Sequence, residues 1–119
     1  MPWFSASIIM YVKFKDGNQN SFPFFENIIL IEAPSRKEAS EKAMQIGKSE
    51  ESDYSGSFTY DDRPAVMKFG GIRKILECEC GLKPPNTGTE VGYSKMAVRQ
   101  ESDFKDLIAG LPVKVDYIE

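Results

Sequence analysis

The chain has 119 residues, of which 41% are hydrophobic and 28% are charged, and its formal net charge is -3. This length and composition are typical of one globular domain and exclude a disordered chain. The acidic balance argues against a dedicated nucleic-acid binder, whose affinity for phosphates comes from clustered Lys and Arg. The sequence contains no histidine, which excludes histidine-based nucleophile pairs and histidine metal ligands.

The distribution of apolar residues bears on membranes and on export. No apolar run reaches the roughly 20 residues that a membrane-spanning helix needs. The first residues lack the basic region and the apolar region of a secretory signal. We therefore expect a cytoplasmic protein that does not associate with a membrane.

Two apolar strands are predicted in the first part of the chain, at residues 3–14 and 24–33. Every second residue from Phe4 to Phe14 is apolar, and the positions between them are mixed. This period of two indicates a half-buried strand in an antiparallel sheet. The second strand is apolar on both faces, which favours a central position in the sheet. The residues between them, 15–23, predict a loop.

A helix is predicted directly after the second strand. Ser35 and Glu38 stand at the spacing of a capping box, in which each side chain satisfies a backbone donor at the helix start. Ala39, Ala43 and Gly47 recur every four residues, so one face of small residues can pack closely against a sheet. Gly47 is also placed to end the helix.

The remaining sequence predicts shorter elements around one long strand. The long strand covers residues 65–80, and Gly70 and Gly71 within it predict a bulge or a bend. Polar stretches at 48–56 and 81–88 predict loops. The other predicted elements are strands at 57–60, 89–99 and 113–117, the last of them at a sheet edge, and a short helix at 102–110.

Together these elements predict a single α+β domain over residues 1–119. The order is β-β-α-β-β-β-α-β. The expected sheet is largely antiparallel, with one main helix packed on one face and a short helix near the C-terminus. No internal repeat or domain linker divides the sequence.

The N-terminal part of the chain resembles a known family. Trp-Phe-Ser-Ala opens the first strand at residues 3–6, Glu-Asn-Ile-Ile-Leu lies in the second at residues 26–30, and an alanine-rich, charged helix covers residues 33–47. Over residues 3–80 these features resemble a family of small bacterial proteins that is described only as domain of unknown function 4288. The resemblance implies a bacterial cytosolic protein, and it brings no activity or catalytic residue with it.

Cys78 and Cys80 are the first candidate for chemistry. On a strand, residues two apart project from the same face about 6.5 to 7 Å apart, at or beyond the usual limit for a disulfide. Two thiols without histidine do not complete a tetrahedral zinc site unless carboxylates help, and Glu77 and Glu79 would face away. The prediction is a pair of reduced thiols near a strand end, and a thiol nucleophile is the alternative.

Asp61 and Asp62, with Asp53 upstream, are a second candidate, in this case for a divalent cation. A calcium loop needs more oxygen ligands at fixed alternating spacing. The residues at 61–64, Asp-Asp-Arg-Pro, predict a turn instead. We therefore expect no metal ion and no cofactor.

The third candidate is the less apolar face of the sheet, where aromatic and basic side chains could converge. The residues concerned are Trp3, Tyr11, Lys13, Arg73, Tyr93, Lys95 and Arg99. Aromatic residues interleaved with basic ones can stack on bases or bind a protein partner. The alternative is that these aromatic residues fill cross-strand pairs and that the charges are simply solvated.

These observations lead to a non-enzymatic protein-interaction module with an unidentified protein partner. A small-ligand or single-stranded nucleic-acid binder that uses the mixed sheet face is the alternative, and a thiol-dependent enzyme is the third hypothesis. A homodimer is also predicted, built along an edge strand such as residues 113–117 or across the aromatic sheet face.

Overall fold

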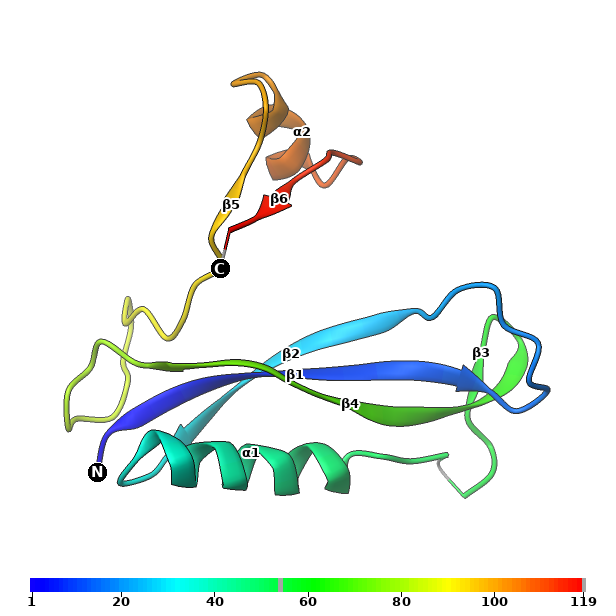
Figure 1. The fold of residues 1–119 in the computed structure, drawn as a ribbon, viewed down its shortest axis with the longest axis horizontal. Helices are drawn as coiled ribbons and strands as arrows, with labels where there is room; N and C mark the ends of the chain where they lie inside the picture. The colour runs from blue at the N-terminus through cyan, green and yellow to red at the C-terminus, as the bar shows by residue number, and fades with distance from the viewer. Residues whose placement is uncertain (54, 119) are drawn as a thin grey trace.

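The computed structural model describes residues 1–53 and 55–118. Its elements follow the predicted order, and the α+β prediction is confirmed. The elements are β1 (Trp3–Phe14), β2 (Phe24–Glu32), α1 (Arg36–Ser49), β3 (Thr59–Tyr60), β4 (Arg63–Glu77), β5 (Met96–Ala97), α2 (Asp103–Ala109) and β6 (Asp116–Tyr117). The main sheet is antiparallel in the order β2-β1-β4-β3, and β5 and β6 form a separate two-stranded sheet (Figure 1).

Helix α1 covers one face of the main sheet (Figure 1). On that side, every second residue of β1 over residues 4–14 is buried, as the alternation predicted. The buried positions of α1 are Ala39, Ala43 and Gly47. Gly47 lies so close to β4 that an added Cβ would stand 2.4 Å from the ring of Phe69. The small residues therefore bring the helix close to the sheet.

The helix does not end at Gly47, so that part of the prediction was wrong. α1 continues to Ser49, and Glu50 is the C-cap. The backbone N–H of Glu50 donates to the carbonyl oxygens of Ile46 and Gly47. Gly47 serves packing instead, because the Phe69 ring occupies the space that a side chain would need.

β2 is an edge strand, so the prediction of a central strand was also wrong. It pairs with β1 alone. On the face away from α1 its large side chains stay in contact with solvent, with exposed fractions of 63% for Phe24, 56% for Ile28 and 43% for Leu30. The double-sided apolar pattern of β2 reflects an uncovered apolar surface and not a central position.

β4 has the predicted irregularity at its glycine pair. Its register against β1 shifts twice opposite residues 7–10. Gly71 has a φ of 141°, a conformation that glycine adopts far more readily than other residues. The predicted bulge at Gly70 and Gly71 is therefore confirmed. The strand ends at Glu77, earlier than predicted, and the cysteines follow it.

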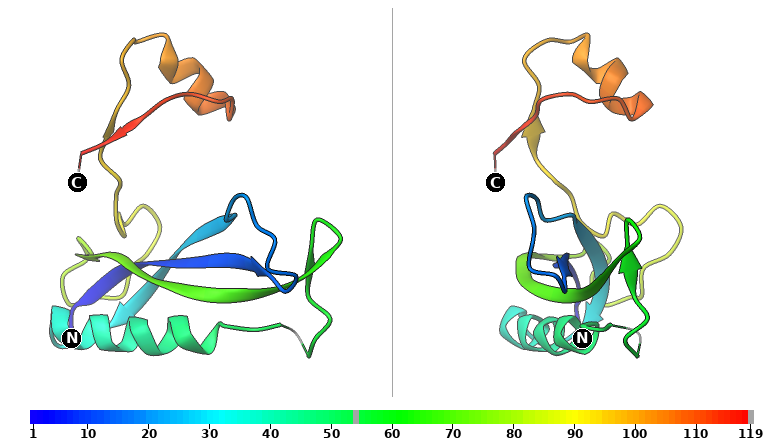
Figure 2. Two further views of the ribbon diagram at one scale, coloured as in Figure 1. Left: turned by 45° about the vertical axis from the view of Figure 1, so that its right-hand side comes forward. Right: turned by 90° about the vertical axis from the view of Figure 1, so that its right-hand side faces the viewer.

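The later strand predictions were too long. Of residues 89–99, only Met96–Ala97 form a strand, because residues 91–94 run across a face of the main sheet and not alongside one of its strands. Of residues 113–117, only Asp116–Tyr117 form a strand, and it pairs with β5. Figure 2 shows this C-terminal part on the side of the main sheet opposite α1.

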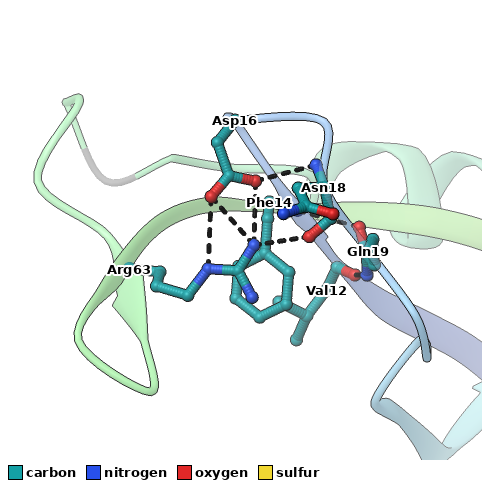
Figure 3. A network of polar contacts seen from close by, with 6 residues as sticks. All are labelled: Val12, Phe14, Asp16, Asn18, Gln19 and Arg63. Carbon is teal, nitrogen blue, oxygen red and sulfur yellow. Dashed lines mark hydrogen bonds and ion pairs between the residues drawn. The ribbon is translucent and has the colours of Figure 1, made fainter.

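A polar network fastens the β1–β2 loop to the start of β4 (Figure 3). Arg63 donates to both carboxylate oxygens of Asp16, each at 2.8 Å, and to the carbonyl oxygen of Asn18 at 2.6 Å. Its guanidinium lies 3.7 Å from the centre of the Phe14 ring. Hydrogen bonds from the Asn18 backbone N–H and from Arg63 lower the pKa of Asp16. These contacts hold the β1–β2 loop against the start of β4.

The side chain of Gln19 completes the edge of β1 where β2 does not reach. Its Nε2 donates to the carbonyl oxygen of Val12 at 2.7 Å, and its Oε1 accepts from the backbone N–H of Phe14 at 3.1 Å. A neighbouring strand would offer the same donor and acceptor. Gln19 thus takes the place of a strand residue at this point of the sheet (Figure 3).

Candidate functional site

The candidate site is the face of the main sheet that points away from α1, which we call the open face. β1 contributes the residues that alternate with those facing α1. β2 and β4 contribute the residues that lie beside them in the sheet. Its members are Trp3, Ser5, Ser7, Ile9, Tyr11 and Lys13 from β1, Phe24, Glu26, Ile28 and Leu30 from β2, and Lys68, Arg73, Lys74 and Leu76 from β4.

Residues 91–94 cover one end of the open face. Ser5 and Ser7 are buried there, although their side chains point away from α1. Gly92 lies so close above Ser5 that an added Cβ would stand 2.6 Å from its Oγ. Lys74 holds the segment through hydrogen bonds to its last two residues. This end of the open face is therefore occupied by the chain itself.

The other end of the open face holds a shallow hollow of about 350 Å³, lined by Ile9, Phe24, Glu26, Arg73 and Tyr117. Nη1 of Arg73 lies 3.0 Å from Oε2 of Glu26. Its guanidinium carbon also lies 4.3 Å from the centre of the Tyr117 ring, a cation–π contact between β4 and β6. Apolar walls with one ion pair suit a partner side chain or a small ligand.

The structure brings together only part of the predicted site. Tyr11 and Lys13 lie at the uncovered end of β1, and Arg73 lines the hollow. Trp3 lies on the same face but at the other end of β1, eight residues from Tyr11, which at the rise of an extended strand is about 26 Å. These residues share one face without forming one cluster.

The three predicted residues from the C-terminal part lie further along the chain. Tyr93 belongs to the covering segment, with its ring centre 5.7 Å from Nζ of Lys74. Lys95 and Arg99 are exposed on either side of β5. Within the described part of the chain, neither has a hydrogen bond or an ion pair with the main sheet, so the predicted site does not include them.

Sequence reasoning missed the apolar part of the open face. Phe24, Ile28 and Leu30 were assigned to a central strand, where their side chains would have been covered on both faces. The carboxylate of Glu26, which pairs with Arg73, was missed as well. No alternation along β2 marks this face as exposed, because both faces of the strand are apolar.

Cys78 and Cys80 follow β4 and do not lie on it, so the prediction that both project from one strand face was wrong. Both thiols are free. Burial, followed by the proximity of Cys80, raises the pKa of Cys78. The Cys78 thiol donates to the carbonyl oxygen of Val91 at 3.5 Å. A thiol with a raised pKa is protonated at neutral pH and is a weak nucleophile.

The predicted turn at Asp61 and Asp62 is confirmed. These residues join β3 to β4 with φ values of 51° and 60°, which is the two-residue turn of a type I′ hairpin. Asp53 instead pairs with Lys15 at 3.4 Å. Within residues 1–53 and 55–118, no three Cys, Asp or Glu side chains are grouped so that they could hold a metal ion.

A second hollow, of about 560 Å³, lies between α1 and β4. Its apolar wall is formed by Met44 and Ile75, and Arg36 at its rim donates to the carbonyl oxygen of Ile75. This hollow is a groove along the helix–sheet contact.

Neither helix of the described residues is long and apolar enough to cross a bilayer.

The chain was compared with family models, with curated proteins and with solved structures. One family model matches residues 3–93, which extends the resemblance beyond residue 80. The match takes in the main sheet, α1 and most of the segment that covers one end of the open face. The comparisons with curated proteins and with solved structures gave no match. The chain belongs to the family described as domain of unknown function DUF4288.

Proposed function

We propose that this protein is a non-enzymatic protein-interaction module that binds its partner on the open face. The observation that carries the proposal is the row of large apolar side chains on β2, formed by Phe24, Ile28 and Leu30, each of them exposed. Glu26 stands between Phe24 and Ile28, with its carboxylate paired to Arg73. Large apolar side chains grouped on the surface of a folded protein commonly mark a binding surface. The partner would cover this row.

Charged groups lie on the same face as the apolar row, on β1 and β4. Lys13 and Lys68 lie on the same face, and Lys68 is held by an ion pair with Glu51 at 3.6 Å. The ion pair between Arg73 and Glu26 borders the hollow. An apolar centre with a polar, solvent-accessible rim is the usual anatomy of a protein–protein interface. The rim would fix the orientation of the partner.

A small-ligand or single-stranded nucleic-acid binder is the second candidate, and the hollow beside Arg73 supports it. The rings of Phe24 and Tyr117, which line the hollow, would stack on a flat ligand there. The electrostatics favour a protein partner over nucleic acid, because Arg73 already pairs with Glu26 and the whole chain is acidic. A thiol-dependent enzyme is the weakest candidate, since the pKa of Cys78 is raised.

Site-specific crosslinking in the native host tests the proposal. A photo-reactive amino acid at Phe24 should trap a protein of another sequence, and the mass of the adduct distinguishes it from two crosslinked copies of this chain. The same amino acid at Gln45, on the exposed side of α1, should give no such adduct. An Ile28→Asp substitution in the Phe24 crosslinking chain should abolish the adduct, because it places a charge in the apolar row. Equal adducts from Phe24 and Gln45 would contradict the proposal.

A binding titration separates the two leading candidates. Labelled single-stranded oligonucleotides are titrated with the purified protein at low salt, and fluorescence anisotropy reports the complex. We expect no saturable binding. Binding that weakens steeply as salt increases would favour the nucleic-acid function, because it reports neutralised phosphates.

A further inference from the structure

The backbone of β2 alternates between the side that faces β1 and the outer side. At one end of the ladder the carbonyl oxygen of Pro23 accepts from Val12 at 2.9 Å, and at the other end Ala33 donates to Pro2 at 3.1 Å. Hydrogen-bonded pairs recur at every second residue of an antiparallel ladder. The odd-numbered residues of β2 therefore bond to β1. The residues whose N–H and C=O point outward are Phe24, Glu26, Ile28, Leu30 and Glu32.

Most of this outer edge has no hydrogen-bond partner. Lys42 Nζ donates to the carbonyl oxygen of Glu32 at 2.7 Å and so closes one end. In the described part of the chain, no hydrogen bond joins the outward backbone groups of Phe24, Glu26, Ile28 and Leu30 to another segment. β2 has no Lys, Pro or bulge of the kind that natural edge strands use to prevent pairing. Of its two charged residues, Glu26 is paired with Arg73 and Glu32 lies at the end that Lys42 closes. The edge is open to a further strand.

A second copy of β2 fits this edge when a two-fold axis passes through Asn27. Phe24 then stands opposite Leu30 of the second copy, and Glu26 stands opposite Ile28. Each of these pairs exchanges two backbone hydrogen bonds. Every outward N–H and C=O from residue 24 to residue 30 acquires a partner, and Glu32 keeps its bond to Lys42.

The same register pairs apolar side chains that a single chain leaves in solvent. On the open face Phe24 meets Leu30 of the second copy. On the other face Phe25, which is 48% exposed, meets Ile29. Asn27 meets its own copy at the axis, where two amides can form hydrogen bonds with each other. Cross-strand pairs of this kind stabilise antiparallel sheets.

The neighbouring registers are less favourable. An axis at Glu26 would place two like charges directly opposite each other, which destabilises a strand pair. An axis at Ile28 would pair Phe24 with Glu32, whose carbonyl oxygen Lys42 already occupies. In the favoured register Glu26 faces Ile28, and its carboxylate keeps the ion pair with Arg73.

We propose that β2 of one chain pairs with β2 of a second copy, antiparallel and about an axis at Asn27, and that this joins two main sheets into one. The proposal goes beyond the proposed function, because it uses the backbone of β2 and a second copy of this chain. On the open face the second copy contacts Phe24 and Leu30, and the part of that face formed by β1 and β4 stays available on both chains.

The first test is a disulfide across the axis. At a directly opposed pair without hydrogen bonds the two Cα atoms lie about 4.5 Å apart, which a disulfide can span. Asn27→Cys should therefore form a covalent dimer under mild oxidation. Phe25→Cys is the matched control, because the two introduced thiols would be about 13 Å apart along the joined strands. The wild-type chain, oxidised in parallel, measures the background from Cys78 and Cys80.

The second test is sedimentation velocity over a wide range of protein concentrations. The wild-type chain should reach twice the mass of one chain. Ile28→Pro should remain monomeric, because proline removes an outward N–H and leaves the ladder to β1 intact. Ile28→Thr keeps the N–H and should still dimerise. Circular dichroism shows whether each variant is folded.

Three results would overturn the proposal. The first is a monomer at every concentration. The second is a dimer that persists in folded Ile28→Pro. The third is crosslinking of Phe25→Cys as efficient as that of Asn27→Cys, which would place the axis elsewhere.

Discussion

The outer sides of β2 and β4 differ in how their backbone groups are satisfied, and the two-residue β3 pairs only with the start of β4. Along β4, the N–H of Ala65 donates to the carbonyl oxygen of Phe58 at 3.1 Å. Met67 and Ser52 exchange hydrogen bonds of 2.8 and 3.2 Å. The chain between α1 and β4 therefore folds back along this edge and covers it.

Further along β4, side chains continue the cover. Oε2 of Glu51 accepts from the N–H of Phe69 at 2.9 Å, and Arg36 donates to the carbonyl oxygen of Ile75. On β2, among residues 1–53 and 55–118, the corresponding contact is the one from Lys42 to Glu32. The comparison shows that hydrogen bonds from other parts of the chain protect the outer side of β4. The outer side of β2 is therefore the edge available to another strand.

The position of α1 also distinguishes β4 from β2. Gly47 lies against Phe69 of β4, and Met44 and Ile75 line the groove beside them. Phe25, which projects from β2 on the helix side, remains half exposed. The helix thus packs mainly against β4 and β1, and β2 is the less covered strand on both faces.

The largest expected effect comes from disturbing the covered side. Gly47→Val places a branched side chain where the Phe69 ring lies, and overpacking of this kind lowers the free energy of unfolding by about 1 to 3 kcal/mol. Urea denaturation measures the change. Gln45→Val, on the exposed side of the same helix, is the control and should have little effect. A wild-type midpoint for Gly47→Val would show that α1 does not pack against Phe69.

The next effect concerns the end of β1 that Gln19 completes. Gln19→Ala leaves the Val12 carbonyl oxygen and the Phe14 N–H without their partner, which should lower the free energy of unfolding by about 1 to 2 kcal/mol. Asn20→Ala removes a neighbouring exposed amide and should change nothing. Equal midpoints for the two variants in urea would mean that water satisfies both groups.

A smaller effect, dependent on pH, is expected at the protected edge. The hydrogen bond from the Phe69 N–H, followed by the charge of Lys68, lowers the pKa of Glu51 below its usual 4.5. A lowered pKa in the folded state means that this stabilisation is complete above the unfolded pKa and is lost as the pH falls through the folded one. The melting temperature should therefore decrease on acidification below pH 4.5.

Glu51→Gln tests this assignment. The substitution should lower the melting temperature at neutral pH and reduce its decrease in acid, because glutamine does not titrate. Glu50→Gln changes the adjacent carboxylate and should leave the acid profile as in the wild type. Identical profiles for Glu51→Gln and the wild type would remove Glu51 from the protection of this edge.

The smallest effect is expected on the bare edge. Ile28→Thr removes apolar surface that a single chain already exposes, so at concentrations where the protein is monomeric the free energy of unfolding should change by less than about 0.5 kcal/mol. Chemical denaturation at low concentration measures it. A loss as large as that of Gly47→Val would mean that Ile28 is buried in the monomer.

Local features of this fold were predictable from the sequence. The alternation in β1 predicted the residues that are buried beneath α1, although Ser5 and Ser7 on the other face are buried as well. Ser35 accepts from the backbone N–H of Glu38 at 3.2 Å, as the capping-box spacing predicted. The short turn at Asp61 and Asp62 also depends on neighbouring residues alone. In each case the pattern that allowed the prediction lies within a few neighbouring residues or within one strand.

Features that depend on contacts between segments far apart in the sequence were not predictable. The apolar residues of β2 do not reveal whether a neighbour lies beside them, and they were assigned to a central strand. Residues 91–94 look like a strand but cross the open face, because their contacts are to Ser5 and Lys74, far away in the sequence. The alternation placed Tyr11 and Lys13 on the candidate site, whereas Lys95 and Arg99 depended on this wrongly predicted strand.

The C-terminal part of the chain bears on how proteins with this sheet can diverge. α2 has no buried residue, and Phe104, Leu107 and Ile108 are exposed on it. Substitution of an exposed side chain has little effect on folding, so this part can change its sequence without loss of the main sheet. The family match ends at Tyr93, before β5 begins. Tyr117 borders the hollow beside Arg73, so substitutions in the C-terminal part can alter access to that hollow without changing the main sheet.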